Sequence, residues 1–206
     1  MSKKLIIAFE GIEGAGKSFH LKKISKYLKK KKIQFISLRE PGGSKGSEKI
    51  RKLILDNKSN FNKKTDLLLY LASRSENIGK IIKKNYKKKV ILIDRFVDST
   101  IAYQHYGMGI KKNLIDTINK FLLEKIKVDF TFLLLINEKN LISRLSKRKI
   151  LNRYDKFNAF FYKKSQNGFI NIAESNKKKY MLINSNNSIN ENKTKILNKI
   201  IKLLNI

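Results

Sequence analysis

The stretch FEGIEGAGKS, residues 9–18, decides the fold class of this chain. It has the spacing Gly-x4-Gly-Lys-Ser of a phosphate-binding P-loop, in which backbone N–H groups and the dipole of the following helix hold phosphate oxygens. We expect Lys17 to reach the β- and γ-phosphates of a nucleotide and Ser18 to bind Mg²⁺. The rest of the loop would surround the phosphates: Gly11, Ile12, Glu13, Gly14, Ala15 and Gly16.

The residues around the P-loop predict a parallel sheet with helices on both faces. An apolar run at 4–9 precedes the loop, and apolar residues at positions 21, 24 and 28 predict a helix after it. The further elements are strands at 33–38, 90–94, 130–136 and 180–184, and helices at 46–57, 65–84, 111–124, from 138, 158–178 and 190–205. Such alternation is typical of an α/β fold. Because no linker or repeat interrupts residues 1–206, we expect a single domain.

The net charge of the chain is extreme, at +31. Such a charge is common in proteins that bind nucleic acid. However, only seven of the 47 basic residues are arginine, and the abundance of lysine, asparagine and isoleucine indicates AT-rich codon usage. Lysine runs at 29–32, 87–89 and 177–179 precede predicted strands, at the sheet edge opposite a P-loop. We therefore expect solvated surface charge, with nucleic-acid binding as the less favoured alternative.

Cysteine is absent from the sequence, which excludes disulfides and cysteine-bound metals. Before Glu10 only five apolar residues stand together, which is too few for a signal peptide or a membrane span. No later run approaches the roughly 18 apolar residues that a span needs. We expect a cytoplasmic protein without a membrane partner.

Asp94 ends the apolar run at 90–94, where P-loop proteins place a second carboxylate beside Mg²⁺, and Arg95 follows it toward the same phosphates. In a chain that uses lysine so widely, each arginine is a candidate for a site that needs a planar, bidentate donor. We interpret Arg144, on an expected helix, as a surface residue. The single proline, Pro41, marks another candidate position.

Five segments together resemble the bacterial thymidylate kinases: FEGIEGAGKS (9–18), REPGGS (39–44), LLLYLASR (67–74), DRFVDSTIAYQ (94–104) and KILNRYD (149–155). Their order and spacing match the family from residue 5 to about residue 183. The resemblance implies a five-stranded parallel sheet with flanking helices and a short lid, here at 146–157. It also implies a homodimer that transfers the γ-phosphoryl group of MgATP to dTMP, with ATP held by the P-loop.

The resemblance also assigns the residues that would hold the dTMP nucleoside. Tyr70 would stack on thymine where the family has Phe, although its place in an apolar helix alone favours a core residue. Arg74 and Gln104 would hydrogen-bond the edge of the base. Tyr103 would pack under the deoxyribose and disfavour a 2′-hydroxyl, and Glu13 would accept a hydrogen bond from the 3′-hydroxyl.

The resemblance also implies that Arg39, Arg51 and Arg95 surround the phosphate of dTMP. Glu40 would lie near the metal or the attacking phosphate, and Ser99 completes the expected dTMP contacts.

Charge on the transferring phosphoryl group must be met by positioned cations, because its transition state is loose. The variable P-loop positions 13–15 carry no arginine. We therefore expect Arg148 and Arg153, in the 146–157 segment, to act as catalytic cations together with Lys17 and Arg95.

The chain departs from the family pattern in three places. His105 and Met108 stand where the family usually has Gly and Arg, and Val-Asp-Phe at 128–130 replaces Pro-Asp-Leu. The segment near 184–186, expected to contact adenine, contains no recognisable motif.

Three other functions remain open at this point. They are a kinase for another nucleotide or nucleoside, a basic P-loop ATPase that binds nucleic acid and uses water as acceptor, and an inactive binding module. The basic runs lack interleaved aromatic residues, which disfavours the ATPase. Intact Lys17, Ser18, Asp94 and Arg95 disfavour the inactive module.

Overall fold

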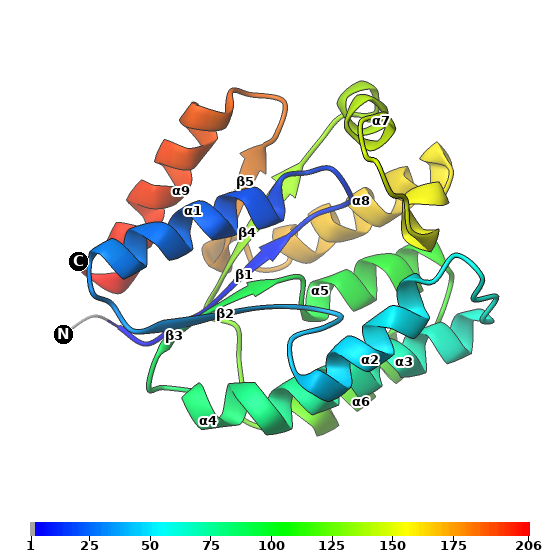
Figure 1. The fold of residues 1–206 in the computed structure, drawn as a ribbon, viewed down its shortest axis with the longest axis horizontal. Coiled ribbons are helices and arrows are strands. Elements are labelled where there is room, and N and C mark those ends of the chain that lie inside the picture. The colour runs from blue at the N-terminus through cyan, green and yellow to red at the C-terminus, as the bar shows by residue number, and fades with distance from the viewer. Residues whose placement is uncertain (1–2) are drawn as a thin grey trace.

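The protein is described by a computed structural model that covers residues 3–206. Its centre is a five-stranded sheet with the strand order β2-β3-β1-β4-β5, and every neighbouring pair of strands is parallel (Figure 1). The strands are β1 (Ile6–Glu10), β2 (Phe35–Arg39), β3 (Val90–Asp94), β4 (Phe130–Leu135) and β5 (Tyr180–Asn184). The predicted α/β class with five parallel strands is confirmed.

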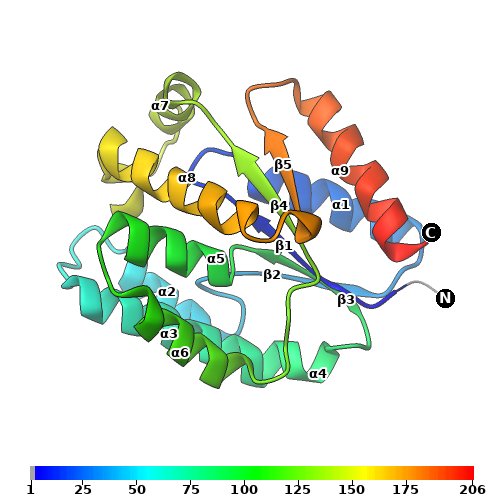
Figure 2. The ribbon, with the colours of Figure 1, turned by 180° about the vertical axis from the view of Figure 1, so that it is seen from behind.

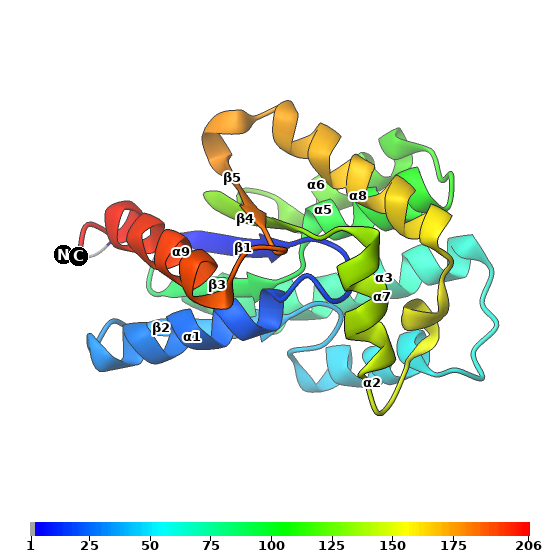
Figure 3. The same ribbon diagram turned by 90° about the horizontal axis from the view of Figure 1, so that it is seen from above.

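Helices cover both faces of this sheet. α1 and α9 lie on one face, and α5, α6 and α8 lie on the other (Figures 2 and 3). The helices are α1 (Lys17–Lys30), α2 (Lys45–Leu55), α3 (Lys63–Asn77), α4 (Lys83–Asn85), α5 (Val97–Thr100), α6 (Lys112–Leu123), α7 (Glu138–Ser146), α8 (Ala159–Glu174) and α9 (Ile189–Leu204). No helix within residues 3–206 has the length and hydrophobicity needed to cross a bilayer.

Irregular helical segments mark the places where the sequence prediction was incomplete. The single helix expected at 65–84 is α3 followed by a π-helical segment, Ile78–Ile82, and the short α4. Residues 97–107, for which no element was predicted, form α5 and a second π-helical segment, Ile101–Gly107. π-Helical turns are rare and often occur at functional sites. This one contains Tyr103 and Gln104, both predicted to contact the acceptor.

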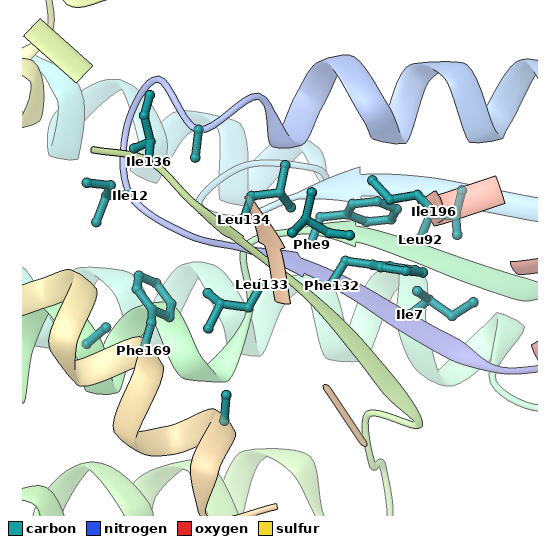
Figure 4. Packing of buried hydrophobic residues seen from close by; sticks show 14 of the residues in the cluster. Ile7, Phe9, Ile12, Leu92, Phe132, Leu133, Leu134, Ile136, Phe169 and Ile196 are labelled. Carbon is teal, nitrogen blue, oxygen red and sulfur yellow. The ribbon is translucent and has the colours of Figure 1, made fainter. Parts of the chain in front are cut away.

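The hydrophobic core lies against both faces of the sheet. Every residue of β1 is buried, as expected for a central strand. Phe9 and Phe132 are register partners on β1 and β4, and their rings stack with centroids 5.2 Å apart (Figure 4). Leu133 points to the other face, where Phe169 of α8 packs (Figure 4). Cross-strand aromatic pairs of this kind stabilise the sheet.

Because the strands are parallel, the segments that carry the predicted site residues lie at one edge of the sheet, where the strands end. β1 leads into the P-loop, β2 ends at Arg39 and β3 ends at Asp94. In open α/β sheets ligands bind at the carboxyl ends of the strands. The lysine runs at 29–32, 87–89 and 177–179 are largely exposed and precede strands, so they lie at the opposite edge as expected.

Replacing the central ring of the core should destabilise the protein strongly. We expect Phe132→Ala to lower the free energy of unfolding by about 3–5 kcal/mol, because it removes a fully buried ring and leaves a cavity. Phe160→Ala is the matched control, since the Phe160 ring is exposed on α8 and its loss should change stability by less than about 1 kcal/mol. Urea unfolding of both variants measures the difference, and similar losses would contradict this description of the core.

Candidate functional site

The P-loop between β1 and α1 has a backbone conformation that only glycine adopts without strain. Gly11 has φ +134°, and a Cβ there would lie 2.2 Å from the backbone oxygen of Leu134 in β4. Gly16, directly before α1, has φ +91°. These conformations turn the chain sharply into α1, whose N-terminus favours anions such as phosphate. The geometry therefore fits the predicted phosphate-binding loop.

Lys17 lies across the mouth of this loop. Its Nζ donates to the backbone oxygens of Gly11, at 2.9 Å, and Ile12, at 2.7 Å. Burial, and secondly the positive charge of Arg95, lower the pKa of Lys17 to about 7. Phosphate oxygens would favour the charged ammonium, because a nearby anion opposes both effects.

Ser18 and Asp94 meet at the carboxyl edge of the sheet, as predicted for a magnesium site. The hydroxyl of Ser18, in the first turn of α1, donates to Oδ2 of Asp94 at the end of β3. Hydroxyl and carboxylate oxygens are ligands that Mg²⁺ accepts, and this ion usually completes its shell with water and phosphate oxygens. The donor set therefore fits the expected ion.

Arg95 connects the P-loop to the residues expected around the acceptor. It takes the left-handed conformation, with φ +67°. Its guanidinium donates to the backbone oxygen of Gly11 at 2.8 Å, to Oε1 of Glu13 at 2.8 Å and to Oγ of Ser99 at 3.3 Å. The hydroxyl of Tyr103 donates to the other oxygen of Glu13, and the Tyr103 ring lies under the guanidinium, 5.2 Å away. Glu13 thus joins one arginine and one tyrosine.

Two adjoining cavities surround this cluster. The larger, of about 390 Å³, is lined by P-loop residues together with Arg39, Glu40, Arg51, Asp94, Arg95 and Arg148. The smaller, of about 30 Å³, is lined by Glu13, Tyr70, Arg95, Ser99, Tyr103, Gln104 and Tyr154. Both share Glu13, Tyr70, Arg95 and Tyr154, so the structure brings most of the predicted site residues together. Tyr70 therefore lines the site rather than belonging only to the core.

Gln104 is a buried residue with an unused donor. Its Nε2 has no hydrogen-bond partner among residues 3–206, although the side chain lines the smaller cavity. A buried polar group without a partner is costly, so a ligand that accepts this hydrogen bond would be favoured.

Arg74 is placed differently from the prediction, which had it contact the thymine edge directly. Its side chain is 2% exposed and lines neither cavity. It donates to Oε2 of Glu40 at 2.9 Å, to Oδ1 of Asn119 at 2.6 Å, and to the backbone oxygen of Phe96 and the hydroxyl of Thr100. In this structure Arg74 therefore positions Glu40, which does line the larger cavity. Burial raises the pKa of Glu40, and Arg74 opposes that rise.

The two remaining candidate arginines of the 146–157 segment have different surroundings. Arg148 lines the larger cavity, and it is held by Asp155, which also lines it. Arg153 lines neither cavity, because its guanidinium pairs with Asp66 of α3 and lies over the rings of Phe61 and Tyr154. The placement of Arg148 fits the predicted catalytic cation, whereas that of Arg153 fits an anchor of the segment.

Arg144 is a functional candidate that the sequence interpretation missed. It is not a surface residue without contacts: it donates to the backbone oxygen of Gly14 in the P-loop at 2.8 Å and to that of Ser185 at 2.7 Å. The Ser185 hydroxyl in turn donates to the backbone oxygen of Ala15 at 2.8 Å. α7 and the loop after β5 thus brace the P-loop. The scarcity of arginine was the one signal in the sequence that could have identified Arg144. Its partners are backbone oxygens, which every residue has, so no sequence motif marks them.

The loop with the unusual His105 and Met108 is closed by contacts of its own. The His105 Nδ1 lies 2.7 Å from the backbone oxygen of Ile110, and the Lys63 ammonium donates to the backbone oxygen of Met108 at 3.4 Å. Gly109 follows with φ +75°. The loop therefore keeps a defined turn with the residues found here.

Comparison with known proteins identifies consistent relatives. A model of the thymidylate kinase family matches residues 9–196. A thymidylate kinase of Thermosipho africanus is 41% identical over 82% of this chain and 85% of its own length, and one of Acholeplasma laidlawii is 36% identical over 97% and 100%. The crystal structure of thymidylate kinase from Ehrlichia chaffeensis aligns with a TM-score of 0.78 at 30% identity, over 96% of this chain and 98% of that one.

Removing the hydrogen bonds from Arg144 to Gly14 and Ser185 should weaken nucleotide binding by the P-loop. We expect Arg144→Met to reduce the affinity for a non-hydrolysable ATP analogue by roughly tenfold, the equivalent of about one lost charge-assisted hydrogen bond. Lys139→Met is the control, because Lys139 is exposed on the same helix and loses the same charge. Calorimetric titration compares the two, and equal affinities would show that Arg144 does not support the loop.

Proposed function

The chain belongs to the thymidylate kinase family, and from that premise we propose that its site transfers the γ-phosphoryl group of ATP to dTMP with the help of Mg²⁺. The protein is a kinase, as its relatives are. The observation that carries the substrate assignment is the junction of two cavities at Glu13 and Arg95, one beside the P-loop and the other between tyrosine rings.

The donor side would use the P-loop and its neighbours. Loop N–H groups and Lys17 would hold the phosphates of ATP, braced by Arg144. Ser18 and Asp94 would hold Mg²⁺, which neutralises phosphate charge when bound. Arg148 would add positive charge beside the transferring group, where charge stabilisation matters more than a general base.

The acceptor side would place dTMP with its phosphate in the larger cavity, near Arg39, Arg51 and Arg95. Tyr70 and Tyr103 would contact base and sugar, and Gln104 would donate its unused N–H to a thymine oxygen. Glu13 would accept a hydrogen bond from the 3′-hydroxyl of dTMP at the same carboxylate oxygen that accepts from the Tyr103 hydroxyl.

Tyr154 of the 146–157 segment would have to move for the base to enter. Its ring packs edge-on against Tyr70, with centroids 5.7 Å apart. The smaller cavity, at about 30 Å³, has room for only two or three water molecules, since one water needs roughly 10–15 Å³ measured in this way. Such a displacement of Tyr154 would make the 146–157 segment a lid.

The alternative function, a basic ATPase that binds nucleic acid, is not supported by the relatives. The lysine runs lie at the sheet edge opposite the P-loop, where they could not guide a nucleic acid to the site.

A homodimer is part of the proposal. α3 and α6 pack together and expose Leu68, Leu114 and Phe121 at 60%, 48% and 78%. Leu114 and Phe121 are seven residues apart, so they share one face of α6. Such an apolar stripe on neighbouring helices would be buried by the same face of a second chain.

The proposed reaction is tested by ATP turnover with a series of acceptors. dTMP should give the fastest ADP release, and dUMP should be slower, because a missing methyl group costs about 1–3 kcal/mol in a binding pocket. UMP should react poorly since Tyr103 crowds a 2′-hydroxyl. Turnover that does not depend on an acceptor, or that rises when DNA or RNA is added, would overturn the proposal.

The two arginines of the 146–157 segment should differ in kinetics. Arg148→Met should lower kcat by about 10³-fold, by analogy with arginine fingers. Arg153→Met, with the same loss of charge, should have a much smaller effect on kcat, because its guanidinium binds Asp66 rather than the cavity. Steady-state kinetics at saturating substrates decide between them; equal losses would contradict the distinction.

Negative charge introduced at Leu114 and Phe121, in the exposed apolar stripe of α6, should prevent the two subunits from associating. The double variant Leu114→Glu/Phe121→Glu should sediment as a monomer, since it would place two carboxylates in the proposed interface. Phe160→Glu/Ile189→Glu is the control, because those exposed residues lie on α8 and α9. Analytical ultracentrifugation gives the mass; a monomeric parent protein, or a double variant that stays dimeric, would refute this interface.

A further inference from the structure

A third cavity, of about 270 Å³, is lined by residues of α5, α6, β4 and β5 and of the segments that connect these elements. We call it the rear cavity. Its lining comes from the junction of β3 and α5, the connection between α6 and β4, β4 itself, and residues 176–180. None of its lining residues lines the two cavities of the catalytic site. Its volume is about two thirds of that of the larger catalytic cavity.

The interior of the rear cavity holds a carboxylate among apolar side chains. Phe96, Ile126 and Val128 contribute apolar walls. Oδ2 of Asp98 accepts a hydrogen bond from the Tyr180 hydroxyl at 2.8 Å, while Oδ1 has no hydrogen-bond partner in the described part of the chain. Burial raises the pKa of Asp98 to about 6, and the hydrogen bond from Tyr180 and the positive charge of Arg74 oppose this rise. A ligand with an N–H donor can hydrogen-bond to this oxygen.

The rim of the rear cavity carries the opposite charge. Lys127 and Lys179 both line it and are exposed. Neither ammonium group forms an ion pair or hydrogen bond within residues 3–206, so both are available to an anion. Most lysines of this chain are simply solvated, but these two stand at the entrance of a cavity whose interior is apolar and acidic. The rear cavity therefore suits a ligand that has a hydrogen-bond donor in its buried part and an anionic group at the rim.

We propose that the rear cavity is a second nucleotide site, for a nucleoside monophosphate whose base carries an amino group. The amino group donates to Oδ1 of Asp98, the ring lies between Phe96 and Val128, and the phosphate contacts Lys127 and Lys179. An aliphatic anion has no donor for Asp98. Thymine offers only a single ring N–H, so the substrate dTMP fits this cavity less well than an amino-bearing nucleotide.

Phe96 and Arg74 connect this cavity to Glu40 of the larger catalytic cavity, which makes the site an effector site. Phe96 lines the rear cavity, and the Arg74 guanidinium lies 5.2 Å from the centroid of the Phe96 ring. Arg74 also donates to the Phe96 backbone oxygen at 2.8 Å and holds Glu40 in the larger catalytic cavity. A ligand that shifts Phe96 would shift Arg74 and Glu40. Binding of dTMP and of the second nucleotide should consequently be coupled.

The test is a calorimetric titration with dCMP of protein saturated with dTMP and a non-hydrolysable ATP analogue, so that the catalytic cavities are filled. We expect one dCMP per chain. The variant Lys127→Gln/Lys179→Gln should bind dCMP at least about tenfold more weakly, because it loses two charge-assisted contacts. The control Lys125→Gln/Lys178→Gln removes the same charge from exposed positions outside the lining and should bind as the parent does.

Failure of dCMP to bind the saturated protein, or an equal loss in the control variant, would overturn the proposal. Decanoate that binds as tightly as dCMP would also overturn it, since it lacks an N–H donor. Coupling has its own readout: dCMP should change the Kd of dTMP, and dTMP that of dCMP, by the same factor. If neither nucleotide changes the Kd of the other, the rear cavity is not an effector site. Loss of dTMP binding itself would contradict the catalytic proposal instead, so the two failures are distinguishable.

Discussion

The contact between Arg95 and Glu13 is the interaction on which the site depends. Glu13 belongs to the P-loop, and Arg95 follows the strand that ends at Asp94. Their ion pair at 2.8 Å, largely shielded from solvent, fixes the loop to β3 and aligns Tyr103 through the second carboxylate oxygen. A buried pair of this kind is costly to break, because one charge would remain without a partner. It therefore holds the larger and the smaller cavity in one relative position.

The fold could be predicted almost completely because its signals are local. Apolar runs bounded by polar residues predicted all five strands to within a few residues, and both β3 and β5 to the residue. The P-loop pattern fixed the site at one edge of the sheet. The π-helical segment Ile101–Gly107 could not be predicted, since a shift from one helical hydrogen-bond pattern to another depends on packing against α8 rather than on periodicity.

The arginines show where sequence reasoning about the site stops. Their scarcity made them candidates for a phosphate or base site, and Arg39, Arg51, Arg95 and Arg148 do line the larger cavity. It did not reveal which partner each one has. Arg74 and Arg153 bind the carboxylates of Glu40 and Asp66, and Arg144 binds backbone oxygens. Whether an arginine faces a ligand or another side chain depends on tertiary geometry that spacing along the chain does not encode.

The claim that Arg95 and Glu13 join the two substrate sites is tested most directly by a double-mutant cycle. Glu13→Gln, Arg95→Met and the double variant would each be titrated with dTMP and with a non-hydrolysable ATP analogue. The account predicts that both ligands bind more weakly to each single variant, and that the double variant loses clearly less than the sum of the two. Strictly additive losses, or an effect on only one of the two ligands, would contradict it.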